Sequence, residues 1–319
     1  MVLAGGSDRE REVSILSANE VEASLLEAGH DVLLRNIDPE NLSALDEFAH
    51  WKCAEEKVIF PVLHGAWGEG GPLQRILDNR GLPYVGSGSQ TSELCMDKHR
   101  TKLALERAQL PTPPYELLSS DKQQRLPPPV VIKALREGSS IDLMICTDHK
   151  SASRARRQLN NRHHKILVEK FISGKELTIG VIGKLQGDVS DQYRNEALPP
   201  IQILPATTYY DYEAKYVRND TRYLFDPAEI GLPMTLLDEL QRMSLAAHHL
   251  LGCRHLSRWD FIVDTEQQPW ILEVNTMPGF TKHSLLPMAA AKAGIAMSAL
   301  TNRLVRLAVQ ETKVVSHRG

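Results

Sequence analysis

The stretch "SRWDFIVDTEQQPWILEVNTMPGF", residues 257–280, predicts a β-hairpin with one polar face. Two largely apolar runs flank the turn "TEQQ", and side chains on a strand alternate between faces. A hairpin centred on Glu266-Gln267 sets Asp260 across from Glu273 and Arg258 across from Asn275. The face of this hairpin that bears its polar side chains is expected to hold Arg258, Asp260, Ile262, Ile271, Glu273 and Asn275.

The polar face of this hairpin suits a hard metal ion. Asp260, Glu273 and Asn275 supply oxygen ligands without His or Cys, which favours Mg²⁺, an ion that usually keeps waters and bridges to phosphates. The alternative is a solvated sheet face with a surface ion pair. The following turn contains Gly279, whose backbone N–H can point at a ligand oxygen, although an ordinary turn explains it equally well.

Composition excludes several classes of function. The chain has 319 residues, enough for two or three domains, and a formal net charge of -3 that gives no footprint for nucleic acid or anionic membrane. It has no apolar run of about 20 residues and no basic, apolar leader. Its four cysteines are scattered without a CxxC pair, which indicates reduced thiols and a cytoplasmic location.

The chain divides into three segments, and we expect domains at 1–90, 91–180 and 181–319. In the first, strands at 1–4, 31–34, 58–63 and 82–86 and a helix at 11–28 indicate an α/β unit with a parallel sheet. The second is expected to be a small α+β unit with helices at about 95–109 and 148–160 and strands at 130–134, 143–147 and 165–172. The third is expected to hold a hairpin-like run at 176–189, a helix at 233–252 and the hairpin above.

Isolated residues give weaker signals. Lys133 ends the apolar run "VVIK" and precedes a small hydroxyl-bearing loop, Gly138-Ser139-Ser140, that could lie over phosphates. Lys98 stands near a helix start, but neither lysine fits a P-loop or GxGxxG spacing, and each alone reads as a solvated charge. Glu169 and Lys170 interrupt an apolar strand, which could instead be an exposed edge.

Two further residues stand near the ends of predicted strands. Glu10 precedes the first predicted helix, where an acid would complement the helix dipole. His64 follows the apolar run 58–63 and could be a satisfied buried histidine. A last stretch, "TTYYDYEAKYVRND" at 207–220, holds four of the chain's eight tyrosines and is too polar for a core strand.

Long motifs in a fixed order carry a resemblance to a known family. They are "GGSDREREVS", "LHGAWGEGGPLQ", "GLPYVGSG", "MDKHRTK", "VIKALREGSS", "LVEKFISGKELT", "YYDYEAKY", "SRWDFIVD" and "ILEVNTMPGFTKHSLLPMAA". In this order the chain resembles the D-alanine–D-alanine ligases of the ATP-grasp superfamily over nearly its whole length. The resemblance implies three domains: an N-terminal parallel-sheet α/β domain and two α+β domains that clasp ATP.

The resemblance also implies roles for individual residues. Expected at the reaction centre are Glu10, Ser139, Tyr216, Arg258 and Gly279. Expected to bind the two D-alanines are His64, Ser284 and Leu285, with Glu10 on the first ammonium. Expected to contact ATP are Lys98, Lys133, Ser140, Glu169, Lys170, Ile172, Glu176 and Lys215. The metal ligands implied are Asp260, Glu273 and Asn275. They are expected to hold Mg²⁺ or Mn²⁺, with two ions more in keeping with the family than one.

The implied reaction joins two D-alanines through an acyl phosphate, releasing ADP and phosphate, for peptidoglycan precursor synthesis. Positioning and charge stabilisation suffice for such chemistry. The tyrosine-rich stretch resembles the family's lid, about 205–222, where Tyr216 would favour an amine as second substrate. A lid would exclude water from the acyl phosphate. The family also implies a homodimer.

The chain departs from the family pattern at several positions. Gly70 replaces a common acid, Ala134 a common proline, and Ile141-Asp142 a small-residue loop; Asp142 is expected to face solvent or a cation. Alternatives are a ligase that makes a D-alanyl depsipeptide or another D-alanyl amide, and a non-catalytic nucleotide-binding protein. A dehydrogenase is disfavoured because the glycine spacing near residue 5 is wrong.

Overall fold

The computed structural model describes residues 1–51, 56–139, 141–185, 195–205 and 221–316, the side chains of 312–316 excepted. The described strands are β1 (Val2–Gly5), β2 (Leu34–Ile37), β3 (Phe60–Pro61), β4 (Tyr115–Ser119), β5 (Val130–Ala134), β6 (Leu143–Cys146), β7 (Lys165–Lys170), β8 (Gly174–Gly183), β9 (Asn195–Ala197), β10 (Ile201–Leu204), β11 (Arg222–Leu224), β12 (Leu256–Asp264) and β13 (Pro269–Asn275). The described helices are α1 (Arg11–Glu27), α2 (Ser43–His50), α3 (Gly65–Gly68), α4 (Pro72–Asn79), α5 (Ser89–Met96), α6 (Lys98–Arg107), α7 (His149–Asn160), α9 (Pro227–Ile230), α10 (Met234–Leu250), α11 (Leu285–Lys292) and α12 (Met297–Ser316).

The N-terminal sheet is parallel, as the sequence predicts, and its strands have the order β2-β1-β3. Helix α1 ends at Glu27, and Gly29 follows with φ of +86°, the left-handed conformation expected after a helix end. The strand predicted at 82–86 is wrong: Tyr84 makes only an isolated parallel bridge to Ile59. The strand predicted at 31–34 begins only at Leu34.

The central sheet is antiparallel, in the order β4-β7-β5-β6, and carries helix α7. Because β7 lies inside this sheet, the alternative that its strand is an exposed edge is wrong. The helix predicted at about 95–109 is confirmed as α6, although α6 begins only at Lys98 and residues 95–96 belong to α5. Asp97 separates the two helices with extended backbone and caps α6, its side chain accepting the backbone N–H of Arg100 at 3.1 Å.

The C-terminal sheet has six strands, with β8 and β12 at its centre and β13 at one edge. Strand β8 begins at Gly174, so it spans the boundary expected at residue 180 between the second and third segments. The hairpin β12–β13 confirms the predicted register, with Asp260 opposite Glu273 and Arg258 opposite Asn275.

One part of the hairpin prediction is wrong. A β-bulge shifts the register between Asp260 and Phe261, so that Phe261 pairs with Ile271 and Leu272 is the extra residue. The alternation of side chains changes phase at the bulge. Ile271 therefore joins the buried apolar cluster with Phe261, on the face opposite Glu273.

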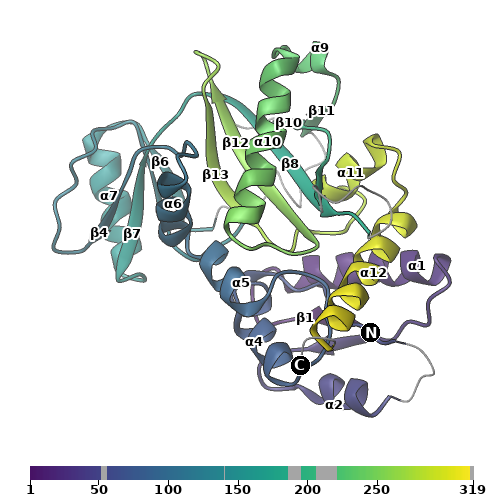
Figure 1. The fold of residues 1–319 in the computed structure, drawn as a ribbon. Coiled ribbons are helices and arrows are strands. Elements are labelled where there is room, and N and C mark those ends of the chain that lie inside the picture. Colours follow the sequence, from purple (N-terminus) through teal and green to yellow (C-terminus); the bar gives the residue numbers. More distant parts are fainter. Residues whose placement is uncertain (52–55, 140, 186–194, 206–220, 317–319) are drawn as a thin grey trace.

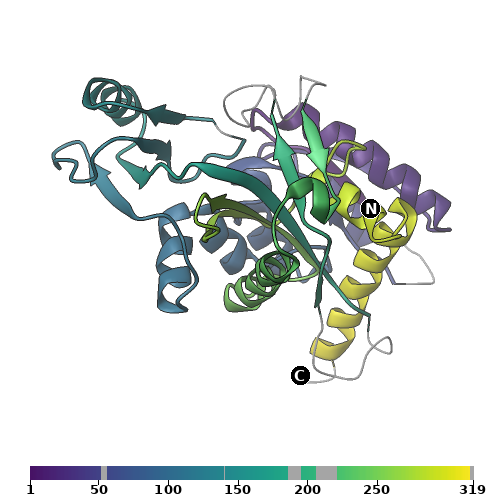
Figure 2. The ribbon, with the colours of Figure 1, turned by 90° about the horizontal axis from the view of Figure 1, so that it is seen from above.

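A shared core joins the N-terminal and C-terminal parts of the chain. One apolar cluster includes Phe60 of β3, Val21 of α1, Ile182 of β8 and Leu304 of α12. Helix α12 lies beside α1 in both ribbon views (Figures 1 and 2), where the hydroxyls of Ser24 and Thr301 are 3.0 Å apart. The central sheet packs α7 over a separate cluster.

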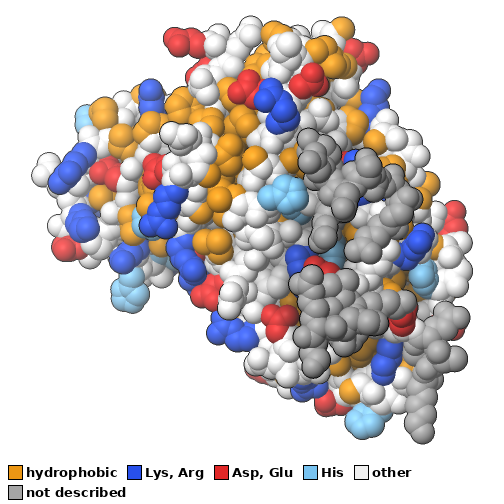
Figure 3. All heavy atoms as spheres, viewed as in Figure 1, with side chains coloured by type: hydrophobic (Ala, Val, Ile, Leu, Met, Phe, Trp, Pro, Cys, Tyr) orange, Lys and Arg blue, Asp and Glu red, His pale blue; other side chains and the backbone are white. Residues whose placement is uncertain are grey.

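The surface shows no concentration of one charge on the face seen in Figure 3, where Lys, Arg, Asp and Glu side chains are interspersed. This agrees with the small net charge of -3. Among the helices that the structure describes, none is both long and apolar enough to cross a membrane.

Candidate active site

A cleft lies where the loops after β1, β5 and β13 meet the start of α6. It is lined by Glu10, Glu69, Cys95, Met96, Lys98, Glu137, Gly138, Ser139, Arg258, Glu273, Val274, Asn275, Thr276, Gly279, Thr281, His283, Ser284 and Leu285. The cleft therefore brings together nine of the site residues that the resemblance implies, from all three segments of the chain.

Glu10 forms the wall of the cleft that comes from the N-terminal sheet. It is buried at the start of α1, where its side chain makes no capping hydrogen bond to that helix. Instead, its Oε1 accepts a hydrogen bond from the hydroxyl of Ser139. Ser139 stands in the loop between β5 and β6 with φ of +49°. A Cβ at Gly138 would come within 3.3 Å of the other Glu10 oxygen, so the glycine lets this loop lie close to Glu10.

Arg258 and Asp260 stand two residues apart on one face of β12, so their side chains point the same way. The Arg258 guanidinium donates to both carboxylate oxygens of Asp260, at 3.0 Å from Nε and 2.9 Å from the second nitrogen. The Thr178 hydroxyl of β8 donates to Asp260 as well, at 2.6 Å. This bidentate geometry fixes the guanidinium at the cleft. The alternative of a solvated sheet face is wrong for Asp260, which is buried.

Lys98 crosses the cleft from the first turn of α6, confirming the prediction that it stands at a helix start. Its Nζ lies 3.3 Å from Glu273 and donates to the carbonyl of Glu137 at 2.7 Å. The Lys98 side chain thus links the β5–β6 loop to β13 through one hydrogen bond and one ion pair.

The three residues proposed as metal ligands form only part of a metal site. Among the described residues, no three His, Cys, Asp or Glu side chains cluster so as to hold an ion. Asp260, Glu273 and Asn275 offer two carboxylates and one amide in register, all hard oxygen donors. Such a set suits an ion that takes further oxygens from a bound phosphate and from water.

Glu69 is a cleft residue that the sequence reasoning missed. It is buried, its Oε1 accepts the backbone N–H of Gly65 at 3.1 Å, and it lies 3.9 Å from Nδ1 of His64. Burial, with a further contribution from the charge of Glu10, raises the pKa of Glu69 to about 8. The glycines around it in "GEGG" are the one sequence signal of its special backbone setting.

His64 lies behind Glu69 and does not line the cleft. Burial lowers its pKa, although the charge of Glu10 opposes this effect. Its Nε2 has no hydrogen-bond partner among the described residues. The alternative of a fully satisfied buried histidine is therefore wrong.

A second missed residue, Lys102, belongs to a buried ionic cluster. Glu169 is 2% exposed, and its two oxygens lie 3.0 Å from Nζ of Lys102 and 2.9 Å from Nζ of Lys133. Burial raises the pKa of Glu169, but the two lysines more than offset this and hold the pKa below its ordinary value. Burial lowers the pKa of Lys102 despite the opposing charge of Glu169. Lys102 stands four residues after Lys98, one turn along α6, which is the signal that could have found it.

The turn after β13 is tightly packed. A Cβ at Gly279 would come within 2.8 Å of Oγ of Ser284. That hydroxyl is held in turn by Thr281, whose backbone N–H donates to it at 3.0 Å. Gly279, Ser284 and the start of α11 at Leu285 thus form one rigid edge of the cleft.

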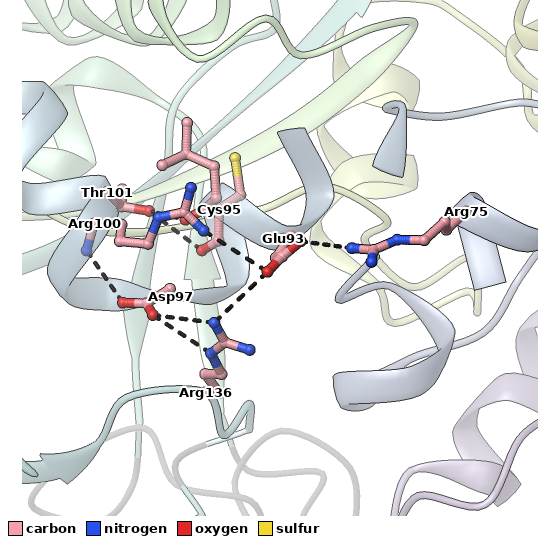
Figure 4. A network of polar contacts seen from close by, with 8 residues as sticks. Arg75, Glu93, Cys95, Asp97, Arg100, Thr101 and Arg136 are labelled. Carbon is pink, nitrogen blue, oxygen red and sulfur yellow. Dashed lines mark hydrogen bonds and ion pairs between the residues drawn. The ribbon is translucent and has the colours of Figure 1, made fainter. Parts of the chain in front are cut away.

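The β5–β6 loop is anchored by ion pairs on both sides. At its start, Arg136 reaches Asp97 at 3.4 Å and Glu93 at 4.0 Å, within the network drawn in Figure 4. At its end, Asp142 pairs with Arg162 at 2.8 Å and His163 at 2.7 Å. The prediction that Asp142 faces a cation is confirmed.

The remaining predicted site residues lie elsewhere. Glu169, Ile172 and Glu176 follow one another along the passage from β7 to β8, where the chain leaves the central sheet and enters the C-terminal one. Lys170 is exposed at the end of β7. Ser140, Lys215, Tyr216 and most of the segment expected to form a lid fall outside the described residues.

The departure at Gly70 has a steric reason. A Cβ at this position would come within 2.3 Å of the Ala66 carbonyl oxygen. Any side chain there would require the backbone around α3 to shift.

Solved structures define the class of fold. The chain is similar to the D-alanine–D-alanine ligase of Bacillus anthracis, with a TM-score of 0.79, 28% identity and 98% of each chain covered. The same enzyme complexed with ATP gives a TM-score of 0.79 at 29% identity, covering 98% of this chain and 97% of the other. The ligase of Coxiella burnetii, at 24% identity and a TM-score of 0.78 over 99% and 95% of the two chains, shares the fold.

Sequence relatives identify the family. The chain is 38% identical to a D-alanine–D-alanine ligase of Dechloromonas aromatica over 97% of both chains. It is 33% identical to one of Methylacidiphilum infernorum over 96% of this chain and 94% of the relative. Residues 103–306 match the family described as "D-ala D-ala ligase C-terminus". The chain belongs to the D-alanine–D-alanine ligase family.

Proposed function

We propose that this protein joins two D-alanines into D-alanyl-D-alanine at the expense of ATP, as a step in peptidoglycan precursor synthesis. One observation carries the proposal beyond family membership. A single cleft holds the Glu10 carboxylate on one wall and the guanidinium of Arg258 beside Gly279 on another. An amino acid bound between them would meet a partner for its ammonium group and donors for a developing oxyanion.

The first D-alanine binds with its ammonium group at Glu10, which Ser139 orients. Its carboxylate oxygen attacks the γ-phosphorus of ATP, and the bond between that phosphorus and the β–γ bridging oxygen breaks. ADP departs, and the D-alanine is now an acyl phosphate. His64 is proposed for the site of the first D-alanine through Glu69, which lines the cleft and lies 3.9 Å from its Nδ1. Enclosure by the walls of the cleft protects the acyl phosphate from water.

The second D-alanine binds at Ser284 and Leu285. Its neutral amine attacks the acyl carbon, and the resulting oxyanion accepts hydrogen bonds from Arg258 and the Gly279 backbone N–H. Phosphate then leaves, and the nitrogen loses a proton to give the peptide. Each group acts by position and charge, so no protein nucleophile is needed.

The nucleotide lies between the central and C-terminal sheets, in an ATP-grasp arrangement. Its phosphates are contacted by lysines and its base and ribose by the passage from β7 to β8. The proposed ATP contacts are Lys98, Lys133, Ser140, Glu169, Lys170, Ile172, Glu176 and Lys215. Asp260, Glu273 and Asn275 hold the Mg²⁺ or Mn²⁺, two ions in the full complex, which neutralises phosphate charge when bound. The Lys133 ammonium, 2.9 Å from Glu169 at the start of this passage, supports an anionic ligand at this place.

The remaining proposals concern the whole protein. Family membership supports three domains at about 1–90, 91–180 and 181–319, although β8 crosses the second of these boundaries. It also supports a lid at about 205–222 with Tyr216 at the reaction centre, a homodimer and a cytoplasmic location. Each is a proposal that separate experiments on the intact chain would test.

The test is ADP release from Mg²⁺-ATP with D-alanine as the sole amino acid, repeated with an equal concentration of D-lactate. We expect ADP release to depend on D-alanine and the dipeptide to dominate at neutral pH. A dominant D-alanyl-D-lactate product would replace the proposal with a depsipeptide ligase. ATP binding without ADP release would indicate a non-catalytic nucleotide-binding protein.

A further inference from the structure

Lys102 is an unusual residue because its charged side chain is almost completely inside the protein. It is 1% exposed and comes from the middle of α6. A buried ammonium group is costly unless it is paired and hydrogen-bonded. A residue of this kind calls for an explanation beyond packing.

Two lysines share one carboxylate in the cluster around Lys102. Lys102 and Lys133 each face a different oxygen of the same carboxylate, that of Glu169. Either lysine alone would balance Glu169. The second cation is therefore in surplus, within a region from which solvent is largely excluded.

The two lysines differ in how firmly they are held. The Lys102 ammonium also donates to the Thr112 hydroxyl at 2.5 Å and lies 5.2 Å from the centre of the Tyr115 ring. Thr112 in turn donates to the carbonyl of Ile271 on β13 at 2.9 Å. Among the described residues, Glu169 is the only polar partner of the Lys133 ammonium. Lys102 is thus the anchored cation and Lys133 the one that can move.

Moving Lys133 is possible only because Lys102 stays. If Glu169 had Lys133 as its single partner, withdrawing that ammonium would leave a buried carboxylate unpaired, which costs several kcal/mol. With Lys102 in place, Glu169 keeps one partner throughout. The cost of redirecting Lys133 towards an anionic ligand is correspondingly small.

We propose that Lys102 is a positioning residue that neutralises Glu169 and so releases the Lys133 ammonium to bind a nucleotide phosphate. This rests on the proposed function, in which Lys133 contacts ATP. Lys102 itself touches no substrate and acts only through Glu169. Its effect, which reaches the phosphates through Lys133, is therefore expected to be larger on ATP than on adenosine, although Glu169 itself is among the proposed ATP contacts.

The test compares dissociation constants for ATP and for adenosine in the full-length chain, measured by competition against a fluorescent nucleotide without D-alanine. We define the phosphate ratio as the adenosine constant divided by the ATP constant. In Lys102→Met, the ratio is expected to fall about tenfold, the size of one charge-assisted contact.

Lys57→Met is the matched control. The Lys57 ammonium also holds several protein groups, the carbonyls of Phe48 (2.6 Å), Ala49 (3.2 Å) and Trp51 (2.9 Å), but these lie in the N-terminal part of the chain. Its removal should lower the melting temperature and leave the phosphate ratio unchanged. An unchanged ratio in Lys102→Met, or an equal fall in Lys57→Met, would overturn the proposal.

A second comparison holds even if Lys102→Met does not fold. In the Glu169→Gln background the buried negative charge is gone, so Lys102 has nothing to neutralise. Adding Lys102→Met to Glu169→Gln should then leave the phosphate ratio unchanged; a fall there would contradict an action through Glu169. These are binding measurements, so they stand even if ligation is not found. Failure of the unaltered chain to bind ATP would overturn both proposals.

Discussion

The chemistry of the cleft depends on a few charged side chains that are fixed before any ligand arrives. Arg258 is held by Asp260 in a bidentate pair, and Lys98 spans from Glu137 to Glu273. Preorganised charges of this kind stabilise a transition state without reorganising during the reaction. The role of these charges is tested most directly by single substitutions that keep the shape of a side chain but change its charge.

Asp260→Asn keeps the size of the side chain but removes its charge. We expect kcat/KM to fall about 10²- to 10³-fold, because both the Arg258 position and the proposed metal site depend on that charge. The measurement is D-alanine-dependent ADP release over a range of Mg²⁺ concentrations.

Asp264→Asn, at the end of the same strand, is the control. Its oxygens accept the backbone N–H of Gln268 at 2.9 Å and Nε1 of Trp270 at 2.9 Å, on the turn away from the cleft. It should lower stability and leave activity within about threefold. Equal losses of activity in the two variants would contradict the role of Asp260.

Glu69 predicts a pH effect on stability with a definite sign. Its pKa is raised from 4.5 to about 8, so between these values the folded state holds a proton that the unfolded chain lacks. Its contribution to the free energy of unfolding is therefore lost as the pH rises through this window. Relative to Glu69→Gln, which mimics the protonated form, the unaltered chain should lose melting temperature from about pH 5 to pH 8.

Glu40→Gln, at an exposed carboxylate, is the control for this titration and should follow the unaltered chain. Parallel pH curves for the unaltered chain and Glu69→Gln would show that Glu69 is ionised in the folded state at neutral pH.

A site residue can be predicted from the sequence when the residues that it pairs with are close to it in the sequence. Asp260 and Glu273 follow from strand alternation across a short turn, so their pairing could be predicted. Lys102 and Glu69 have only weak local signals, because the charges that act on them from Glu169 and Glu10 are distant in sequence. Only the folded chain brings such charges together.

At the scale of elements, the prediction was right where a period persists and wrong where a single residue changes it. The register of hairpin β12–β13 is predicted correctly from Arg258 to Asp260, where the alternation persists, and helix α1 is predicted with nearly its observed bounds. The bulge at Leu272 and the cap at Asp97 each interrupt a pattern within one residue. No propensity predicts the bulge, whereas Asp is a residue type that is favoured at helix N-caps. The consequence at β13 is functional, because the bulge sends Ile271 to the core and leaves Glu273 in the cleft.

Gly279→Ala tests the turn that follows this hairpin. The added methyl group would sit 2.8 Å from Oγ of Ser284 and push aside the start of α11. We expect the KM for the second D-alanine to rise about ten- to hundredfold, with a much smaller change for ATP. Steady-state kinetics with each substrate varied separately measures this.

Gly88→Ala is the matched control, because the nearest atom to its added methyl group is 4.0 Å away. It should leave both KM values unchanged. Equal increases in the KM values for ATP and D-alanine in Gly279→Ala would indicate a general distortion instead of a defined subsite.

At the scale of the whole molecule, buried histidines tie stability to pH. Burial lowers the pKa of His248 to about 3, and it also lowers the pKa of His255, against the opposing effect of Glu311. His255 links distant parts of the fold: its Nδ1 accepts the backbone N–H of Gly86 at 3.0 Å, and Nε2 lies 3.2 Å from Glu311 on α12.

Acidification should therefore destabilise the protein. Below the unfolded-state value of 6.5, the unfolded chain binds protons that buried neutral histidines do not, so the free energy of unfolding falls as the pH falls. Melting curves from about pH 7 to pH 5 should show this loss. It should be smaller in His248→Asn and unchanged in His50→Asn, at an exposed histidine. Equal loss in both variants would contradict the assignment.

The central claim is that the cleft activates a carboxylate as an acyl phosphate for attack by an amine. The most direct measurement uses D-alanine labelled with ¹⁸O in both carboxyl oxygens, with Mg²⁺-ATP, followed by mass spectrometry of the products. Our account predicts D-alanyl-D-alanine, together with one ¹⁸O atom in each released phosphate. Dipeptide formed with unlabelled phosphate would contradict it, because the carboxylate oxygen would never have been joined to phosphorus.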